Sequence, residues 1–319
     1  MVAIAVLLVI GVTIGATLLF TRDGDGPSTP PTSDVPSDIA SANDTGPVSI
    51  ITEEPTCEAY TGINDAVANV QKNGWGDIRG SLGPSPEWTA DDRRRTEEVV
   101  TVLRNSADQA VALAKQTPHR VVRELYEQFV AYARAYINSI PTYTPAADQL
   151  ATANVAAGNA LMAICNAVEF GSADRSLAVE PARPPTEVVP ISDPGNPSLF
   201  MERANAICPE WLGVDTRFRA DTAAWQAMDS SVDAARWTPE QRQTQLLALP
   251  RLQSLATEIS SLGRDSGNAI LEDFAETAAL YLRAYVSTGD TYVAADSFLT
   301  ATAFRIRNIV SAACESGPG

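Results

Sequence analysis

The chain has 319 residues, with 23 lysines and arginines against 39 aspartates and glutamates, and a formal net charge of −16 at pH 7. This acidic balance excludes nucleic acid as a partner, because neutralising phosphates requires clustered lysine and arginine side chains. Hydrophobic residues make up 45% of the chain, a fraction typical of globular proteins with buried cores.

Residues 1–20 are predicted to form a transmembrane anchor. Val2 to Phe20 carry no charge, and a helix of that length spans roughly 28 Å, close to the thickness of the bilayer hydrocarbon. A cleaved signal peptide is the alternative, but no basic residue precedes the apolar run and no A-x-A-like site follows it. We therefore expect one membrane span, with the membrane as a partner of the chain.

Residues 21–55 are predicted to be a disordered stalk. The segment is rich in Pro, Ser, Thr and Asp, with few aliphatic residues before Val48. Such a composition buries too little apolar surface to offset the entropy lost on ordering. We expect the stalk to hold the rest of the chain away from the membrane, with Val48 to Ile51 docking on the first folded module as an extended strand.

The remainder of the chain is an internal duplication. Glu127 to Tyr136 (EQFVAYARAY) and Glu276 to Tyr285 (ETAALYLRAY) share the pattern E-x-x-x-x-Y-x-R-A-Y at an offset of 149 residues (276 − 127). The same offset carries three further landmarks onto identical residue types: Trp88 onto Trp237, Tyr143 onto Tyr292 and Cys165 onto Cys314. A repeat of this kind decides the architecture and is considered before any local element.

The duplication predicts two helical modules. Module 1 covers residues 56–170 and module 2, its repeat, covers residues 198–316. Between them, residues 171–197 contain prolines at positions 181, 184, 185, 190, 194 and 197. Because proline-rich segments are semi-rigid spacers, we expect this linker to separate the modules.

Each module is predicted to contain four helices. In module 1 they begin near Glu58, Thr89, Thr117 and Thr144, where threonine caps precede proline or acidic residues. The capping box at Thr238 to Gln241 in module 2 marks the same start as Thr89. Four helices joined by short loops favour an up-and-down bundle. The expected fold is therefore all-α: a transmembrane helix followed by two tandem-repeated, disulfide-closed, four-helix-bundle-like modules.

Four cysteines allow three disulfide connectivities. Each module has one cysteine at the start of its first helix and one at the end of its fourth, and a bundle brings these ends together. We therefore predict pairing of Cys57 with Cys165 and of Cys208 with Cys314. Because disulfides persist in oxidising compartments, both modules are expected outside the cytoplasm. Zinc is disfavoured, since the short Cys-x2-4-Cys spacing is missing.

The repeated charged motif supplies the candidate site. Its residues are Glu127, Arg134, Tyr136, Glu276, Arg283 and Tyr285. An arginine beside an apolar stripe needs a partner, so a structural ion pair with Asp148 or Asp296 on the fourth helix is the first interpretation. The alternative is a pocket in each bundle whose arginine receives an anionic ligand, with the glutamate lining the same pocket.

No catalytic, cofactor-binding or metal-binding constellation is expected. His119 is the one histidine, so it has no counterpart in module 2, and no glycine-rich nucleotide-binding motif occurs. Trp75 and Trp225 are interpreted as packing anchors; an exposed pair that binds a glycan or a partner is the alternative.

Four features of the sequence carry a resemblance to a known group of proteins: the membrane span, the Pro/Ser/Asp-rich stalk, the sequence GPVSIITEEPTC and the Ala/Arg-rich helices that end in a lone cysteine. The chain resembles the conserved single-pass membrane proteins of mycobacteria and related actinobacteria, a group without an assigned activity. The resemblance implies a place in the cell envelope and supplies no site residues.

These observations favour a non-enzymatic protein. We expect a membrane-tethered extracytoplasmic scaffold or binding protein of the bacterial cell envelope, whose partner is an envelope protein, a lipid or the cell wall. One alternative is a ligand-binding or sensor module with an anionic-ligand pocket in each bundle. Another is an accessory subunit of a cell-envelope enzyme.

Overall fold

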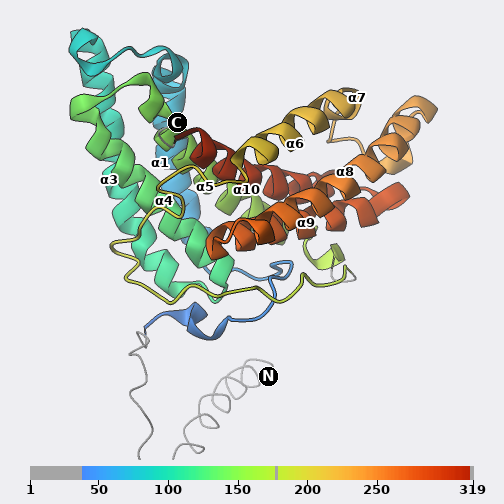
Figure 1. Ribbon diagram of the computed structural model, residues 1–319. Coiled ribbons are helices and arrows are strands. Elements are labelled where there is room, and N and C mark those ends of the chain that lie inside the picture. Colours follow the sequence, from blue (N-terminus) through green and yellow to red (C-terminus); the bar gives the residue numbers. More distant parts are fainter. Residues whose placement is uncertain (1–37, 177–178, 317–319) are drawn as a thin grey trace, which may run out of the picture. The chain divides into compact units, whose positions relative to one another are not determined.

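The computed structural model describes residues 38–176 and 179–316, which belong to one compact unit (Figure 1). The predicted anchor over residues 1–20 and residues 21–37 of the predicted stalk lie outside the described residues. The described part is helical and contains no β-strand, so the all-α prediction is confirmed for it.

Ten α-helices follow in the same order in the two halves of the described chain. The first half contains α1 (Cys57–Val70), α2 (Gly76–Ile78), α3 (Ala90–Gln116), α4 (Arg120–Ser139) and α5 (Asp148–Glu169). The second half contains α6 (Cys208–Asp221), α7 (Ala223–Gln226), α8 (Pro239–Asp265), α9 (Ala269–Thr288) and α10 (Ser297–Ser316). In each half the four long helices pack in sequence as a bundle, as the short loops between them require.

The predicted caps fix the start of the longest helices. Thr89 caps α3 and Thr238 caps α8, each through a capping box with the residue three positions later. The prediction for α4 was early by two residues, because Thr117 does not cap it. The Thr117 hydroxyl instead donates to the Glu54 carboxylate (2.6 Å), and α4 begins after His119.

Equivalent contacts recur at the 149-residue offset. Trp88 packs on Tyr143 with ring centroids 5.1 Å apart, and Trp237 packs on Tyr292 at 5.3 Å. The backbone N–H of Ser85 donates to the Tyr143 carbonyl (3.0 Å), as that of the residue 149 positions later does to Tyr292 (2.9 Å). The same residue types therefore fix the same helix connections in both halves.

Both predicted disulfides are present. Cys57 is bonded to Cys165 and Cys208 to Cys314, with Cα atoms 5.4 Å apart in each pair. Each bond joins the start of the first long helix of a half to the end of its fourth long helix. The duplicated cysteine positions thus identified the pairing correctly.

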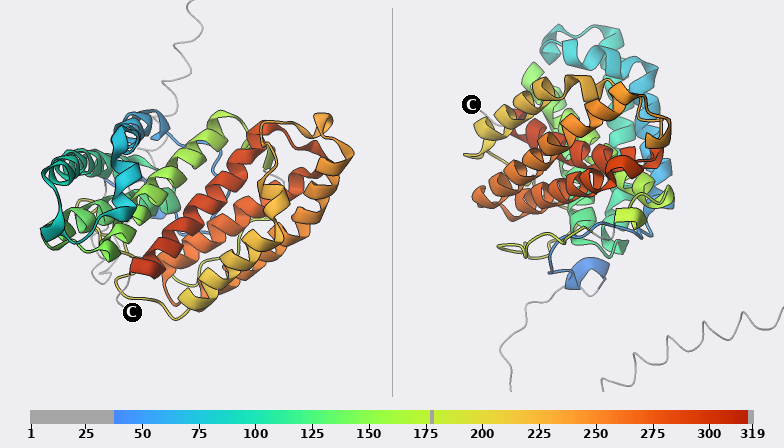
Figure 2. Two further views of the ribbon diagram at one scale, coloured as in Figure 1. Left: turned by 90° about the horizontal axis from the view of Figure 1, so that it is seen from above. Right: turned by 90° about the vertical axis from the view of Figure 1, so that its right-hand side faces the viewer.

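Helices α5 and α10 join the two halves, and their contact is the most extensive between helices of the described chain. Figure 2 shows them side by side. Alanine and glycine make up much of the buried surface of α5, and small side chains let helix backbones approach closely. A helix that is apolar on all sides belongs in a core. Among the described residues, only 145–169 are long and apolar enough to cross a membrane, and 67% of that window is buried in protein.

The segment between the halves is not a spacer that holds them apart. We name residues 44–51 arm 1 and residues 193–200 arm 2; they correspond at the 149-residue offset. In arm 2, the Phe200 N–H donates to Gln128 of α4 (2.9 Å). In arm 1, the Ile51 N–H donates to the Tyr281 hydroxyl of α9 (3.2 Å). Each arm thus contacts a helix of the other half. Arm 1 also docks on the first half as expected, because the Arg120 side chain of α4 donates to the carbonyls of Asp44 (2.7 Å) and Gly46 (3.0 Å).

The predicted stalk also ends earlier than residue 55. Four residues of this segment are buried: Ile39, Val48, Ile51 and Glu54. The two halves together form the surface that buries them, and the apolar pattern of a single half does not predict it. The predicted boundaries of the modules remain predictions, but their cores merge into one.

Candidate functional site

The repeated motif of the first half does not line a shared pocket. Glu127 is buried and accepts two hydrogen bonds from Arg123 (3.0 and 3.2 Å), while burial raises the pKa of its carboxyl. Arg134 is partly exposed and pairs with Asp108 of α3 (3.3 Å), and it also donates to the Gly195 carbonyl of arm 2. The predicted partner Asp148 instead pairs with Arg79 (3.3 Å).

The motif of the second half differs in the surroundings of its arginine. Glu276 accepts hydrogen bonds from Ser260 (2.7 Å) and Arg264 (3.0 Å), and Arg283 lies 3.7 Å from its second carboxylate oxygen. The predicted partner Asp296 pairs with Arg175 (3.3 Å). Both predicted partners were wrong, because each repeated arginine points away from the fourth helix of its bundle.

A polar cavity of about 500 Å³ lies beside Arg283. Its charged lining residues are Glu180, Arg183, Arg264, Asp265, Glu276 and Arg283. Gln253, Thr257, Ser260 and Ser261 of α8 supply uncharged hydrogen-bonding groups. The balance of charges favours an extended polar ligand over a lone anion. In the first half, arm 2 lies on the corresponding arginine.

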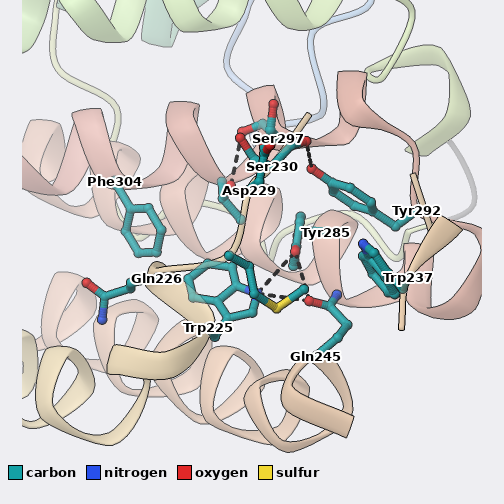
Figure 3. Close-up of a pocket in the computed structure, with 12 residues that line it drawn as sticks. Trp225, Gln226, Asp229, Ser230, Trp237, Gln245, Tyr285, Tyr292, Ser297 and Phe304 are labelled. Carbon is teal, nitrogen blue, oxygen red and sulfur yellow. Dashed lines mark hydrogen bonds between the residues drawn. The ribbon is translucent and has the colours of Figure 1, made fainter. Parts of the chain in front are cut away.

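A second cavity, of about 330 Å³, contains Tyr285 of the motif (Figure 3). Its aromatic residues come from α7, α9, α10 and two connecting turns: Trp225, Tyr285, Phe304, Trp237 and Tyr292. Trp225 Nε1 donates to Gln245 Oε1 (2.9 Å), and the Tyr285 hydroxyl donates to the same oxygen (3.1 Å). These two bonds fix the Gln245 carboxamide with its nitrogen as a donor, because its oxygen must be the acceptor.

The nitrogen of this carboxamide has no partner. Gln245 is 2% exposed, and its Nε2 atom is buried without a hydrogen bond in the described chain. An unpaired buried donor costs free energy, and the residue that carries it lines a cavity. Asp229 is the acid among the described lining residues, which include no basic residue. A neutral or cationic ligand group with an acceptor oxygen fits this lining best.

The corresponding place in the first half is filled. Tyr136, Tyr143 and Trp75 are 0%, 1% and 2% exposed, and burial raises the pKa of Tyr143 to about 12. Arg79 reaches this place from the short helix turn after α2 and bonds Asp148 and Thr152 of α5. The residue 149 positions after Asp148 is Ser297, which cannot hold an arginine in this way. The aromatic residues are therefore repeated in the two halves. Arg79 fills the space beside them in the first half, and the cavity is open in the second.

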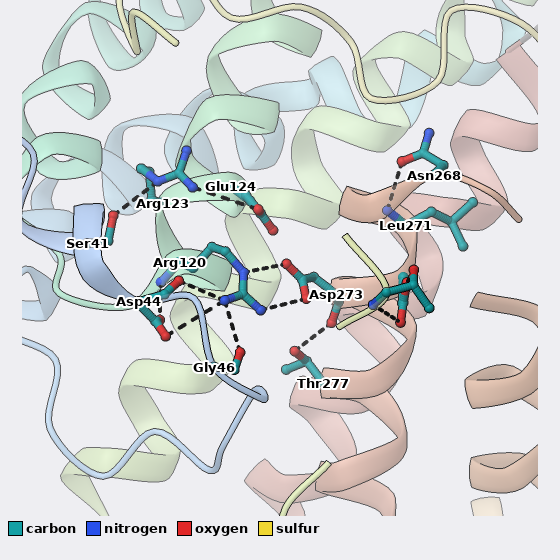
Figure 4. Close-up of polar contacts among 12 residues, drawn as sticks. Ser41, Asp44, Gly46, Arg120, Arg123, Glu124, Asn268, Leu271, Asp273 and Thr277 are labelled. Atoms are coloured by element: carbon teal, nitrogen blue, oxygen red, sulfur yellow. Dashed lines mark hydrogen bonds and ion pairs between the residues drawn. The ribbon is translucent and has the colours of Figure 1, made fainter. Parts of the chain in front are cut away.

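Charged residues also meet where α4 faces α9 (Figure 4). Arg120 donates two hydrogen bonds to Asp273 (2.7 and 2.9 Å) and two to the carbonyls of Asp44 (2.7 Å) and Gly46 (3.0 Å) in arm 1. Glu124 is 1% exposed, and neither carboxylate oxygen accepts a hydrogen bond from any residue that the structure describes. Burial, then the nearby Asp273, raises the pKa of Glu124 well above its usual range.

This network was not among the features predicted from the sequence. A usable signal was present, since Glu124 and Asp273 occupy equivalent positions of the repeat on helices with apolar faces. His119 contacts the Glu53 carbonyl through Nε2 (2.8 Å). Within residues 38–176 and 179–316, no group of three or more His, Cys, Asp or Glu side chains is placed to hold a metal ion.

Comparison with known proteins places the chain in a family. The model of the family described as mycobacterial ESX-1 associated protein matches residues 39–318. An uncharacterised protein of Mycolicibacterium smegmatis (strain MKD8) is 41% identical over 320 residues, which cover 98% of this chain and 85% of that relative. No solved structure matches. The predicted kinship with conserved mycobacterial proteins is confirmed, while the membrane span remains a prediction. The chain belongs to the family of mycobacterial ESX-1 associated proteins.

Proposed function

We propose that the chain is a non-enzymatic, extracytoplasmic binding protein of the cell envelope that engages a protein component of the ESX-1 secretion system. Residues 1–20 would tether it to the cell membrane. The family description supports the link to that secretion system. The two disulfides support an exported location, because such bonds persist in oxidising compartments.

The binding role rests on one observation: Gln245 lines an aromatic cavity, and its buried side-chain nitrogen has no hydrogen-bond partner among the described residues. A bound acceptor oxygen would satisfy this donor, and desolvated hydrogen bonds of this kind give a site its selectivity. Trp225 and Phe304 offer apolar faces to the rest of the ligand. These features suit an aromatic or aliphatic side chain of a partner protein, with a carbonyl oxygen close to it.

The proposal can be tested by filling the cavity. Thr300 is 8% exposed and lines it, and its hydroxyl bonds only a carbonyl of its own helix (3.0 Å) among the described contacts. We expect Thr300→Phe to occupy the space intended for the partner while α10 keeps its fold. Affinity purification from native mycobacterial membranes, followed by mass spectrometry, should recover an ESX-1 component with the wild-type chain and lose it with this variant.

A control distinguishes loss of binding from loss of structure. Thr152 of α5 lies outside this cavity and bonds Arg79, so Thr152→Ser keeps its hydroxyl and should retain the partner. Both variants should keep the wild-type melting temperature within a few degrees. Equal recovery of the ESX-1 component with Thr300→Phe would show that the aromatic cavity is not the binding site.

A further inference from the structure

In the first half, the repeated arginine binds an extended segment of the same chain. Arg134 of α4 donates to the Gly195 carbonyl of arm 2 and pairs with Asp108 (3.3 Å). The turn in arm 2 is held locally, since the Gly195 N–H donates to the Asp193 carboxylate (2.8 Å). An extended, non-helical segment with an Asp-x-Gly turn is therefore a natural occupant of this helix face.

The second half lacks the matching occupant. Gly46 of arm 1 is the counterpart of Gly195, but its carbonyl accepts from Arg120 (3.0 Å) and not from Arg283. Within the described contacts, Glu276 at 3.7 Å is the one ion-pair partner of Arg283. The guanidinium of Arg283 therefore lines a cavity of about 500 Å³ that arm 1 leaves open.

The residue types around Arg283 also indicate the charge of an occupant. The counterpart of Asp108 is Thr257, which lines the cavity and carries no charge. Arg283 is consequently less well neutralised on the α8 side than Arg134 is on the α3 side. Arg183 also lines the cavity, and the three arginines of the lining are balanced by three carboxylates, of which Glu276 alone pairs with Arg283 among the described contacts. A carboxylate from outside the chain can replace the missing acid and form charge-assisted hydrogen bonds.

We propose that the cavity beside Arg283 is a docking site for an extended polar peptide segment of a partner protein that carries one acidic residue. A carbonyl or carboxylate oxygen of that segment accepts from Arg283, as Gly195 accepts from Arg134. Polar side chains of α8 line the path of the peptide backbone. The site is separate from the aromatic cavity and takes a ligand of opposite charge preference, so it goes beyond the function proposed above.

The template within the chain supplies the probe. A fluorescent peptide with the sequence of residues 191–199, ISDPGNPSL, would be titrated into the full chain in detergent, with fluorescence anisotropy as the readout. The site at Arg134 is already occupied by this segment at a high effective concentration, so the free peptide reports on the second half. We expect saturable binding that Arg283→Gln weakens roughly tenfold or more, the effect of losing a charge-assisted hydrogen bond.

Two further variants and two competitors complete the test. Thr257→Asp should weaken binding, because it restores the acid found in the first half, and Arg134→Gln should leave binding unchanged. A scrambled peptide should bind less tightly. Binding that is insensitive to Arg283→Gln and Thr257→Asp would overturn the proposal. So would inorganic phosphate that displaces the peptide at equal concentration, which would identify a simple anion site.

Discussion

Replacing Arg120 with methionine should destabilise both halves of the chain in one step. The Arg120 side chain is 2% exposed and its partner Asp273 is 4% exposed. Removing the arginine leaves a buried carboxylate without its two charge-assisted hydrogen bonds and also frees the carbonyls of Asp44 and Gly46. Breaking a buried ion pair by removing one partner costs about 3–5 kcal/mol, so we expect a loss of unfolding free energy in that range.

Urea unfolding at pH 7 would measure this loss, with far-UV circular dichroism and tryptophan fluorescence as independent probes. Tryptophans occur in both halves, so coincident transitions report unfolding of the whole unit. The double variant Arg120→Met/Asp273→Leu should recover most of the stability, because well-packed apolar residues replace buried ion pairs at little cost. Arg94→Met, at a pair that is more than half exposed, should have no measurable effect. A loss below about 1 kcal/mol for Arg120→Met would refute the importance of the buried pair.

The other predictions concern the disulfides, a buried carboxyl and a close helix crossing. Replacing Cys57 and Cys165 by alanine opens a loop with a sequence separation of 108 and should lower the free energy of unfolding by up to about 4–5 kcal/mol. Calorimetry should still show a single unfolding transition. Two separate transitions would show that the halves are independent. Burial raises the pKa of Glu124, so its ionisation penalty is absent below the unfolded glutamate pKa of about 4.3 and grows as pH rises above it. The gain in melting temperature from Glu124→Gln should therefore be small at pH 4 and larger at pH 7, and an equal gain at both pH values would contradict this sign. A Cβ atom added at Gly263 would lie 2.5 Å from the Cβ of the facing alanine on α9, so Gly263→Ala should lower the free energy of unfolding in urea by about 1–3 kcal/mol. Gly62 has open space around it, so Gly62→Ala should be neutral or stabilising by about 0.5–1 kcal/mol. A neutral Gly263→Ala would mean that α8 and α9 are less tightly packed.

Local features of the fold were predictable because they depend on neighbouring residues. The N-cap at Thr89 and the capping box at Thr238 followed from residue spacing, and the cysteine pairing followed from the duplicated positions together with the geometry of a four-helix bundle. The packing of α5 against α10 was not predictable in the same way. The alanine-rich sequence of α5 is consistent with its burial over most of its surface, but no pattern within one helix identifies the helix that covers it.

The candidate site shows the same limit. The repeat pointed to Tyr285 and Arg283, and each lines a cavity of the second half. The repeat did not show that Arg79 would fill the aromatic place in the first half or that arm 2 would cover Arg134. Both outcomes depend on segments outside the motif, where the two halves have diverged in sequence.

The most direct test of the proposed binding role is site-specific photo-crosslinking in living mycobacterial cells. A photoreactive amino acid at Phe304 would lie in the wall of the aromatic cavity, and the same group at Val155 would occupy the corresponding position of the first half. We predict an adduct with an ESX-1 protein from position 304 that is missing from position 155 and is lost when Thr300→Phe fills the cavity. Adducts with ESX-1 proteins from both positions, or from neither, would contradict the account.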